Sequence, residues 1–257
     1  MTMWKKLMFA LCLGGVAVAV AAQAADTGVP PEVEKTVRAA IESFGPKVHI
    51  ESVTPSPVPG FYRVIASGQM VYVTADGKYM LNGDLVDVAK RHSLNDDAWA
   101  GFRKAELARV PAAQRIVFAP PHPKTTLTVF TDVNCGFCRK LHEHIDDFMK
   151  AGIAIEYLAW PREGVTTTAG NPTPTYTEMV SVWCAADRKS AFTAAKQGKA
   201  PKPATCDNPV QAEFELGERL GVNGTPAIFT ADGRQLGGYV TADQVLDDLR
   251  KHPTGGG

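Results

Sequence analysis

The sequence has no excess of charge of either sign, because its 27 basic and 27 acidic residues cancel at neutral pH. It also has no block of like charges and no visible internal repeat. A protein that binds nucleic acid normally presents a basic patch or stripe to the phosphates. Nucleic acid is therefore not an expected partner.

Long hydrophobic runs are absent except near the N-terminus. Residues 7–22, "LMFALCLGGVAVAVAA", carry no charge, follow a short basic start, and lead to small residues at Ala22 and Ala24. This pattern is typical of a secretory signal peptide, which we place over residues 1–24. A transmembrane anchor is the alternative, but the run is short for a span and contains glycines.

Cysteine is scarce, and its count depends on that cleavage. The chain has five cysteines, of which Cys12 leaves with the signal peptide. Cys135, Cys138, Cys184 and Cys206 remain, which is an even set. Disulfides persist in exported proteins, so all four are candidates for disulfide chemistry.

Residues 25–92 are expected to form a small N-terminal unit. Apolar residues at helical spacing predict an amphipathic helix over 30–44. Short alternating runs from 48 to 88 predict an antiparallel sheet, with a hairpin at Asp76-Gly77. A core of about sixty residues is thin, and an exposed sheet edge favours pairing. We therefore predict that this unit is a dimerisation domain.

Residues 93–120 are expected to link this unit to a second domain. The stretch 94–117 is rich in helix-favouring and charged residues, so we predict a linker helix with Asn95 as its N-cap. A proline-rich segment then ends it.

Residues 121–257 have an α/β pattern. A near-continuous apolar run predicts a strand at 126–133 that is covered on both faces. A helix over 136–150 and a second strand at 153–160 follow closely. This order favours a βαβ crossover.

The rest of this domain is predicted to contain an inserted helical segment and a closing hairpin and helix. The segment of about sixty residues after the second strand shows two helical patterns. A β-hairpin is predicted to turn at Asp232-Gly233, and Thr241 is placed to cap a last helix over 241–252.

The pair Cys135 and Cys138 lies where the first strand gives way to a helix. The positive end of a helix stabilises a thiolate, so Cys135 is predicted to be a nucleophile toward disulfides. Cys138, one turn into the helix, would resolve the mixed disulfide. Gly136 would let a substrate backbone approach, and Phe137 would offer an apolar surface.

Other uses of the pair are less favoured. A two-residue loop is a poor structural staple, because closing it removes little unfolded-state entropy. A zinc site needs four ligands, usually with a second close pair, whereas Cys184 and Cys206 lie far apart. Copper handling by the thiolates stays a minor alternative, and we expect no metal and no cofactor. His142 and His144 are assigned packing or solvent-facing roles.

The dipeptide Thr225-Pro226 lies just before a predicted strand, in "NGTPA". A CxxC motif at a β–α junction followed by Thr-Pro before a later strand resembles the thioredoxin fold. In that fold the proline is cis and lies beside the active-site cysteines. A cis peptide leaves the preceding residue's backbone free to pair with an extended substrate. An ordinary loop proline is the alternative.

The resemblance extends over essentially the whole mature chain. The segments "FTDVNCGFC", "WPREG", "WCAADRKSAF", "ATCDN" and "LGVNGTPA" occur in that order. Together they resemble the bacterial periplasmic thiol:disulfide isomerases of the DsbC/DsbG family. Members of the DsbG type usually carry proline at the first position between the cysteines, so Gly136 makes the chain DsbC-like. Oxidases of the DsbA type have Pro-His there.

This resemblance implies an α+β fold class. A C-terminal thioredoxin-like domain with a helical insertion is joined by a linker helix to a small, cystatin-like N-terminal dimerisation domain. Cys135 is implied to be the nucleophile and Cys138 its resolving partner. A structural disulfide is implied between Cys184 and Cys206. The residues expected to contact substrate are Gly136, Phe137, Thr225 and Pro226.

The implied function is that of a periplasmic disulfide isomerase with chaperone activity. It would act as a homodimer on misfolded, disulfide-containing exported proteins, and a DsbD-type membrane reductase would return it to the reduced state. A periplasmic oxidase or reductase of the same fold is one alternative, and a non-enzymatic holdase chaperone is another. Two positions depart from relatives of this fold. Phe137 replaces a common tyrosine, and Val129 stands where thioredoxins place a buried acid for proton transfer.

Overall fold

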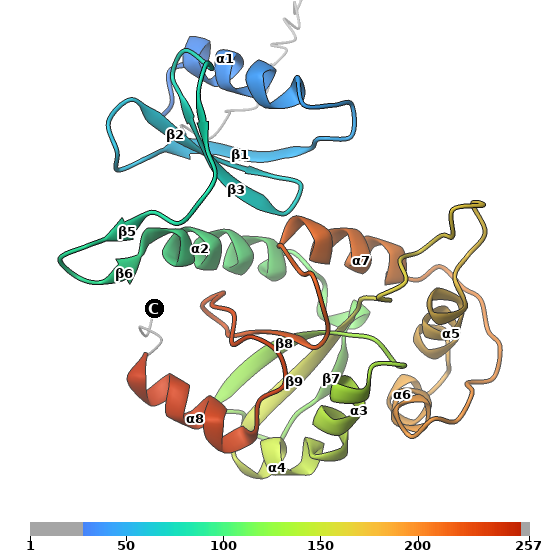
Figure 1. Cartoon of the computed structure of the whole chain (residues 1–257). Helices are drawn as coiled ribbons and strands as arrows, with labels where there is room; N and C mark the ends of the chain where they lie inside the picture. The colour runs from blue at the N-terminus through green and yellow to red at the C-terminus, as the bar shows by residue number, and fades with distance from the viewer. Residues whose placement is uncertain (1–27, 253–257) are drawn as a thin grey trace, which may run out of the picture.

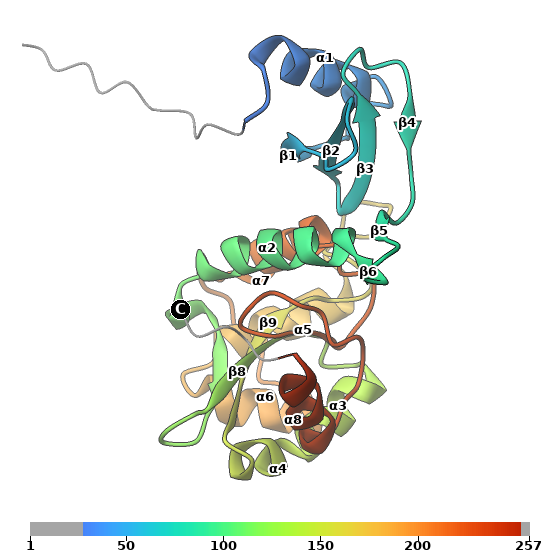
Figure 2. The same ribbon diagram turned by 90° about the vertical axis from the view of Figure 1, so that its left-hand side faces the viewer.

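The computed structural model describes residues 28–252, which form two units stacked end to end with a helix between them (Figures 1 and 2). The predicted signal peptide, residues 1–24, lies outside the described residues. Across residues 28–252, none of the helices combines the length and the apolar character that crossing a bilayer requires.

The N-terminal unit is one helix packed on an antiparallel sheet. Helix α1 (Pro31–Glu42) lies on a sheet of order β1-β2-β3-β4. Its strands are β1 (Ile50–Pro55), β2 (Phe61–Ala66), β3 (Gln69–Thr74) and β4 (Met80–Leu81). The predicted helix and sheet are therefore confirmed. Their shared core is built mainly from β-branched side chains, including Val37, Ile41, Val53, Val64, Val71 and Val73.

The predicted turn at Asp76-Gly77 connects β3 to β4. Gly77 has a φ of +70°, a conformation that favours glycine, and the Thr74 hydroxyl donates to Asp76 Oδ1 at 2.6 Å. Beyond the turn, Tyr72 pairs with Leu81 across the two strands. The hairpin prediction is confirmed, and β4 becomes an edge strand of this sheet.

The linker helix begins differently from the prediction. Helix α2 (Leu94–Ala108) follows the short strands β5 (Val86–Asp87) and β6 (His92–Ser93), and Ser93 is its N-cap. The prediction that Asn95 caps the helix is wrong. The Asn95 side chain is buried and its Oδ1 accepts a hydrogen bond of 2.5 Å from the Tyr72 hydroxyl, so it fastens the N-terminal sheet to α2 instead.

The linker helix also ends earlier than residue 117, so the prediction over 94–117 is wrong beyond Ala108. Pro111 lacks an N–H and disfavours helix at the residue before it. A short 3₁₀ turn at Ala112–Gln114 follows, and residues Ile116–Phe118 then form β7. This strand belongs to the second sheet, because it pairs antiparallel with a strand of the C-terminal unit.

The C-terminal unit contains a second sheet of order β10-β8-β9-β7. Its central strands are β8 (Thr125–Thr131) and β9 (Ile153–Ala159), which run parallel to each other. The short strand β10 (Ala227–Phe229) pairs antiparallel with β8. The predicted βαβ crossover is confirmed, and β8 is buried along its last five residues because helices cover both faces of the sheet.

The crossover contains two helices rather than the single helix predicted over 136–150. Helix α3 (Gly136–Glu143) stops at His144, and α4 (Ile145–Lys150) begins directly after it. The His144 N–H bonds to a carbonyl three residues back instead of four, which tightens the last turn. Two acidic residues in the first turn of α4 then favour a new helix start.

The inserted segment forms three helices, so the prediction of two is wrong. These are α5 (Pro174–Trp183), α6 (Arg188–Lys196) and α7 (Val210–Arg219). In Figure 1, α7 lies next to the C-terminal end of α2, while α5 and α6 lie on the side of α3. The insertion therefore covers the end of β8 at which the cysteine motif begins.

The end of the chain follows the prediction in part. Gly233 turns the chain with a φ of +86°, but the return from β10 is only a single bridge between Phe229 and Gln235. A Cβ on Gly233 would stand 2.0 Å from the Ala100 carbonyl oxygen, so the turn packs directly against α2 and needs glycine there. The last helix, α8 (Ala242–Lys251), is capped by Thr241 as predicted.

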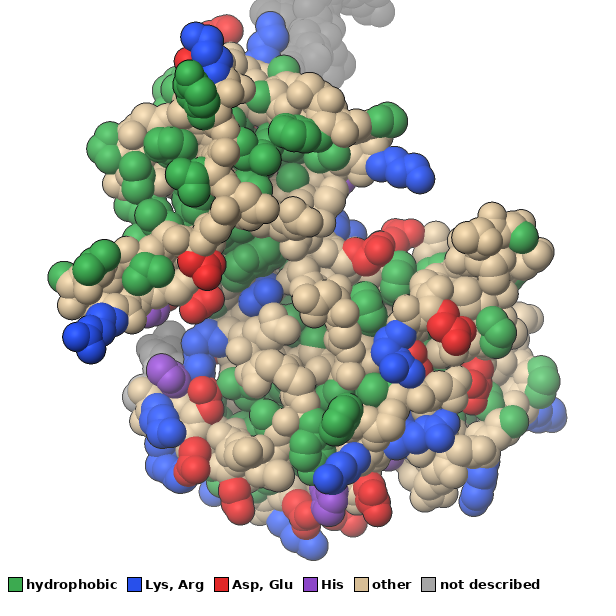
Figure 3. All heavy atoms as spheres, viewed as in Figure 1, with side chains coloured by type: hydrophobic (Ala, Val, Ile, Leu, Met, Phe, Trp, Pro, Cys, Tyr) green, Lys and Arg blue, Asp and Glu red, His purple; other side chains and the backbone are tan. Residues whose placement is uncertain are grey.

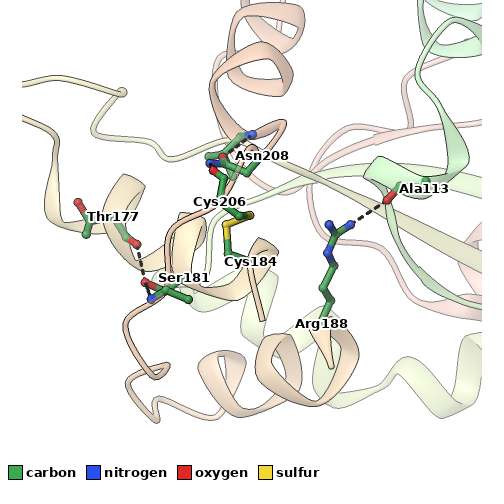
Figure 4. The surroundings of a disulfide bond; sticks show 9 residues. Ala113, Thr177, Ser181, Cys184, Arg188, Cys206 and Asn208 are labelled. Carbon is green, nitrogen blue, oxygen red and sulfur yellow. Dashed lines mark hydrogen bonds between the residues drawn. A yellow bond between two sulfur atoms is a disulfide. The ribbon is translucent and has the colours of Figure 1, made fainter. Parts of the chain in front are cut away.

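A disulfide joins Cys184, at the C-terminal end of α5, to Cys206, on the segment that leads into α7 (Figure 4). The Ser181 hydroxyl holds the same two segments together, because it donates to the Thr177 carbonyl and accepts from the Ala204 N–H. The insertion is thus closed on itself by one covalent bond and a small polar network.

Removal of this disulfide is expected to destabilise the protein. The cross-link spans 22 residues, a loop for which chain entropy gives about 3 kcal/mol. Urea unfolding of the Cys184→Ala/Cys206→Ala variant should show a loss of this size in the free energy of unfolding. The dependence of that free energy on urea concentration, which reports the surface exposed on unfolding, serves as the control. A loss below about 1 kcal/mol would contradict the entropic account.

Candidate active site

The active-site motif begins where β8 turns into α3. The loop between them is held by Asp132, whose Oδ1 accepts from the Asn134 N–H at 2.7 Å, and whose carbonyl accepts from the Cys135 N–H at 3.1 Å. Cys135 is the N-cap of α3, and its side chain makes no capping hydrogen bond. The sulfur therefore stands at the positive end of the helix and is not used to cap it.

Cys135 is only 3% exposed, and its sulfur lies 3.1 Å from the Thr225 carbonyl oxygen, to which the protonated thiol donates. The hydrogen bond from Cys138 is the main cause that lowers the pKa of the Cys135 thiol to about 5. Burial opposes this shift, while the Thr225 side chain, the Cys138 N–H and the positive charge of Arg162 add to it. Cys135 is thus a thiolate at neutral pH, the form that attacks a disulfide.

Cys138 has the opposite character. It is 1% exposed, and burial followed by its hydrogen bond to Cys135 raises the pKa of the Cys138 thiol above its ordinary value. Both cysteines are free thiols in this structure. One sulfur is therefore poised to attack, and its neighbour is a protonated thiol that must lose a proton before it can react.

The peptide bond between Thr225 and Pro226 is cis. It brings the Thr225 carbonyl to the Cys135 sulfur, just before β10 begins at Ala227. The Thr225 hydroxyl is buried and has no hydrogen-bond partner among the described residues. The backbone beside the reactive sulfur thus forms one wall of the site.

The surface around the sulfur is open and apolar. A Cβ on Gly136 would meet nothing within 4 Å, and the Phe137 ring is 63% exposed. Tyr239 lies beside it, with ring centroids 6.4 Å apart, and the Lys140 ammonium stands 5.2 Å from the Tyr239 ring centre. Tyr239 was missed from the sequence, because its loop is distant from the motif in the chain.

An ion pair between the buried Asp132 and the half-exposed Arg162 supports the loop. Asp132 is 1% exposed, and its Oδ2 accepts from the Arg162 backbone N–H at 2.9 Å and from the Arg162 guanidinium at 3.2 Å. The positive charge of Arg162 also lowers the pKa of Cys135 and so stabilises its thiolate. The segment "WPREG" that carries Arg162 was noted in the sequence, but this role was not assigned to it.

A second basic residue, Lys196, is buried at the same loop from the opposite side. It is 4% exposed and donates to Thr131 Oγ1 at 2.6 Å and to the Asp132 carbonyl at 2.9 Å. It was also missed from the sequence. A signal was present, since Lys196 follows the buried Phe192 by four residues and therefore shares its face of α6.

The two histidines differ in environment, within the roles predicted for them. His142 is buried, and its ring contacts the Tyr157 hydroxyl at 3.2 Å and the Thr193 hydroxyl at 2.9 Å. His144 is exposed and lies 3.2 Å from Asp147. In the described part of the chain, no group of three or more His, Cys, Asp or Glu side chains is placed to hold a metal ion.

Two family profiles match the chain. The profile described as a thioredoxin-like domain matches residues 112–253. The profile described as a disulfide bond isomerase protein N-terminal domain matches residues 18–96. Together they account for both units and support the predicted fold class.

Curated relatives match over nearly the full length. The thiol:disulfide interchange protein DsbC of Salmonella typhimurium is 35% identical, over 89% of this chain and 93% of the relative. This chain belongs to the DsbC family. The DsbC of Dickeya dadantii is 38% identical over 78% of this chain and 80% of its own. Like these relatives, the chain is a thiol–disulfide isomerase/oxidoreductase.

Among solved structures, a disulfide interchange protein from Neisseria gonorrhoeae is 28% identical and covers 55% of this chain and 97% of its own, with a TM-score of 0.47. The Helicobacter pylori DsbG structure is 15% identical and covers 76% of this chain and 99% of its own, with a TM-score of 0.39.

Proposed function

We propose that this DsbC-family protein is a periplasmic homodimer that isomerises wrong disulfides in exported proteins, with Cys135 as its nucleophile. The observation that carries the proposal is the Cys135 thiol at a helix N-terminus with a pKa of about 5, directly beside the Thr225 backbone. A thiolate at that place attacks disulfides in a client whose backbone the site can hold.

The reaction starts with Cys135. Its thiolate attacks one sulfur of a wrong substrate disulfide, and the other substrate sulfur leaves as a thiolate. A substrate thiolate then attacks the mixed disulfide, which forms a new substrate disulfide and returns Cys135 as a thiolate. Electrons balance without any net oxidant, so the enzyme finishes the cycle in the state in which it began.

An escape route uses Cys138. If no substrate thiolate attacks, Cys138 loses its proton and attacks the Cys135 sulfur, so that the Cys135–Cys138 disulfide forms and the substrate leaves with a reduced thiol. The enzyme must then gain two electrons and one proton, because Cys135 returns as a thiolate and Cys138 as a protonated thiol. A DsbD-type membrane reductase is the proposed donor, as the family resemblance implies.

Substrate binding would use the surfaces on both sides of the sulfur. The Thr225-Pro226 backbone would pair with an extended client chain, in the manner of strand addition. Gly136 leaves open space for that chain, and the exposed Phe137 offers an apolar contact. Apolar contacts that do not read a sequence suit an enzyme that handles many different misfolded chains.

Dimerisation is proposed through the edge of the N-terminal sheet. Strand β4 and the segment after it expose large apolar side chains. On the face of the N-terminal unit that is visible in Figure 3, few side chains are charged. An exposed apolar edge strand tends to pair with another chain. The exposed side chains concerned are Tyr79, Met80, Leu81, Val86 and Val88.

Charges placed on this edge should therefore break the dimer. In a Leu81→Glu/Val88→Glu variant, both side chains start more than half exposed, at 55% and 86%, so the monomer should tolerate them. Light scattering after size exclusion should show the mass fall by half. Phe44→Glu, at a site 67% exposed away from this edge, is the matched control and should stay dimeric. A mutant that keeps the dimer mass would contradict the proposed interface.

The activity test is recovery of function by a substrate whose disulfides have been scrambled. An isomerase used in the reduced form should restore activity without added oxidant. A net oxidase would instead act on the fully reduced substrate, and a net reductase would leave free thiols. The proposal would be overturned if the protein did not restore the scrambled substrate and instead oxidised the reduced substrate or left free thiols.

A further inference from the structure

Lys196 is only 4% exposed beneath the active-site loop, and among the described residues no carboxylate pairs with its ammonium directly. Its hydrogen bonds go to two neutral oxygens, Thr131 Oγ1 at 2.6 Å and the Asp132 carbonyl at 2.9 Å. A buried cation without a direct counter-charge is costly. Burial accordingly lowers the pKa of Lys196 to about 8, within reach of neutral pH.

The same two residues that bind Lys196 also contact Cys138. The Thr131 hydroxyl and the backbone of Asp132 both lower the pKa of the Cys138 thiol, and so does the positive charge of Lys196. The Thr131 oxygen accepts from Lys196, so its own proton is free to point toward the sulfur. Thr131 thus lies between the ammonium and the buried thiol.

Other charged and titratable groups face this site but are occupied. Asp132 binds Asn134 through one carboxylate oxygen and Arg162 through the other. The ring of His142 is held by two hydroxyl groups, and burial, followed by the charge of Lys196, lowers its pKa to about 4.

The remaining cation near Lys196 is Arg139, whose guanidinium donates to the Val133 carbonyl and the Asn134 side chain. A guanidinium stays protonated, so it cannot take a proton. Tyr157 also lies near enough for the charge of Cys138 to act on it, but burial raises the pKa of its hydroxyl well above the ordinary value, so it stays protonated. Lys196 therefore combines a path to the sulfur with a suitable proton affinity.

We propose that Lys196 accepts the proton of Cys138, through the Thr131 hydroxyl, when Cys138 resolves the mixed disulfide on Cys135. This inference rests on the proposed roles of the two cysteines. The Cys138 S–H gives its proton to Thr131 Oγ1 while the Thr131 O–H proton passes to neutral Lys196 Nζ. The Cys138 thiolate then attacks Cys135 Sγ, the new S–S bond forms, and the substrate sulfur leaves as a thiolate.

The timing follows from electrostatics. The Cys135 thiolate is one of the charges that keep Lys196 protonated in the free enzyme. When a substrate caps Cys135, this negative charge disappears and Lys196 gives up its proton more readily. The lysine therefore becomes a base at the stage at which Cys138 needs one.

A route to solvent is present on the far side of Lys196. A groove between α3, α4 and α6 is lined by Arg139, His142, Thr193, Lys196 and Gln197, among others. Protons can leave Lys196 there after the disulfide has closed. Neither Cys135 nor Cys138 lines this groove.

The test separates attack from resolution with the aromatic disulfide 5,5′-dithiobis(2-nitrobenzoate). Cys135 attack releases a first coloured thiolate, and Cys138 attack on the mixed disulfide releases a second, so stopped flow gives two phases. In Lys196→Met we expect the second phase to slow by about tenfold or more at pH 7. The first phase should change by less than about threefold.

The pH profile and two pairs of variants identify the role. In the wild type the second phase should level off as Lys196 becomes neutral, whereas in Lys196→Met it should keep rising with hydroxide. Lys196→Arg keeps the charge but cannot accept a proton, so it should stay as slow as Lys196→Met. Thr131→Val should slow the second phase, and Thr131→Ser, which keeps the hydroxyl, should not.

Each contrary result has a distinct meaning. A Lys196→Met second phase within twofold of wild type, recovery in Lys196→Arg, or equal slowing of both phases would overturn the proton transfer. Loss of the thermal transition in the variants would assign Lys196 a structural role instead, which the Thr131→Val/Thr131→Ser pair would check independently. A wild-type first phase that survives Cys135→Ser would instead overturn the proposed function.

Discussion

Replacing Cys135 with serine is expected to reduce isomerisation of a scrambled substrate to the uncatalysed rate. Every step of the proposed cycle uses the Cys135 sulfur, first as nucleophile and then as leaving group. A serine hydroxyl at this site is neutral at pH 7 and does not form a mixed disulfide. The measurement is the recovery of substrate activity over time, with reduced wild-type enzyme in parallel.

The matched control is Cys138→Ser, which keeps the nucleophile and removes only the resolving thiol. This variant should still form mixed disulfides, and these should accumulate because the escape route is closed. Electrophoresis without reductant would show the trapped species. Wild-type isomerisation by Cys135→Ser would contradict the mechanism outright.

The holdase alternative is tested in the same set of proteins. A Cys135→Ser/Cys138→Ser variant retains the exposed Phe137 surface and the N-terminal unit. If it still suppresses aggregation of an unfolded protein fully, chaperone activity is separable from the thiol chemistry. If suppression fails as well, the binding of clients depends on the covalent step.

The catalytic motif was predictable because its chemistry is local in the sequence. Cys135 and Cys138 are separated by one helical turn, and a thiol at a helix N-terminus needs no distant partner to be recognised as reactive. The dipeptide Thr225-Pro226 lies far away in the chain, yet the family pattern connects it to the motif. The hairpin at Asp76-Gly77 was equally predictable, since two adjacent residues are enough to favour the turn.

Errors arose where tertiary contacts decided the outcome. Ser93 and Asn95 are both good capping residues, and only the contact between Asn95 and Tyr72 explains which of them caps α2. The break between α3 and α4 at His144 was not predicted, because no glycine or proline marks it in the sequence. The early end of α2 is different, because Pro111 was a signal in the sequence that deserved more weight.

The support of the active site was the least predictable part. Lys196 and Thr131 are 65 residues apart and meet only because α6 packs over the end of β8. A lysine on the apolar face of a helix was the available clue, since long cationic side chains usually reach for water. Position 129 of β8 holds an apolar valine, where thioredoxins carry a buried acid. The charged side chain that reaches this strand is Lys196 of α6, which is basic and bonds to Thr131.

The alkylation of Cys135 should depend on pH in a way that reflects its acidity. Because the pKa of Cys135 is about 5, about nine in ten of these side chains are thiolates at pH 6, against roughly three in a thousand for a free thiol. A weaker base is also a poorer nucleophile, by about fortyfold over this range. Iodoacetamide should therefore label Cys135 roughly tenfold faster than a free cysteine at pH 6, and the rate should fall as pH drops through 5.

Two variants at position 138 show where this acidity comes from. The hydrogen bond from Cys138 is the largest cause of the low pKa of Cys135, so Cys138→Ala should move the midpoint of labelling upward. Cys138→Ser keeps a donor in the same place and should move it less. Mass spectrometry of labelled protein would give both midpoints, with the Cys184–Cys206 disulfide silent toward the reagent. A wild-type midpoint near 8.5, the value of an ordinary thiol, would mean that the helix end and Cys138 do not activate the sulfur, and the proposed attack would lose its physical basis.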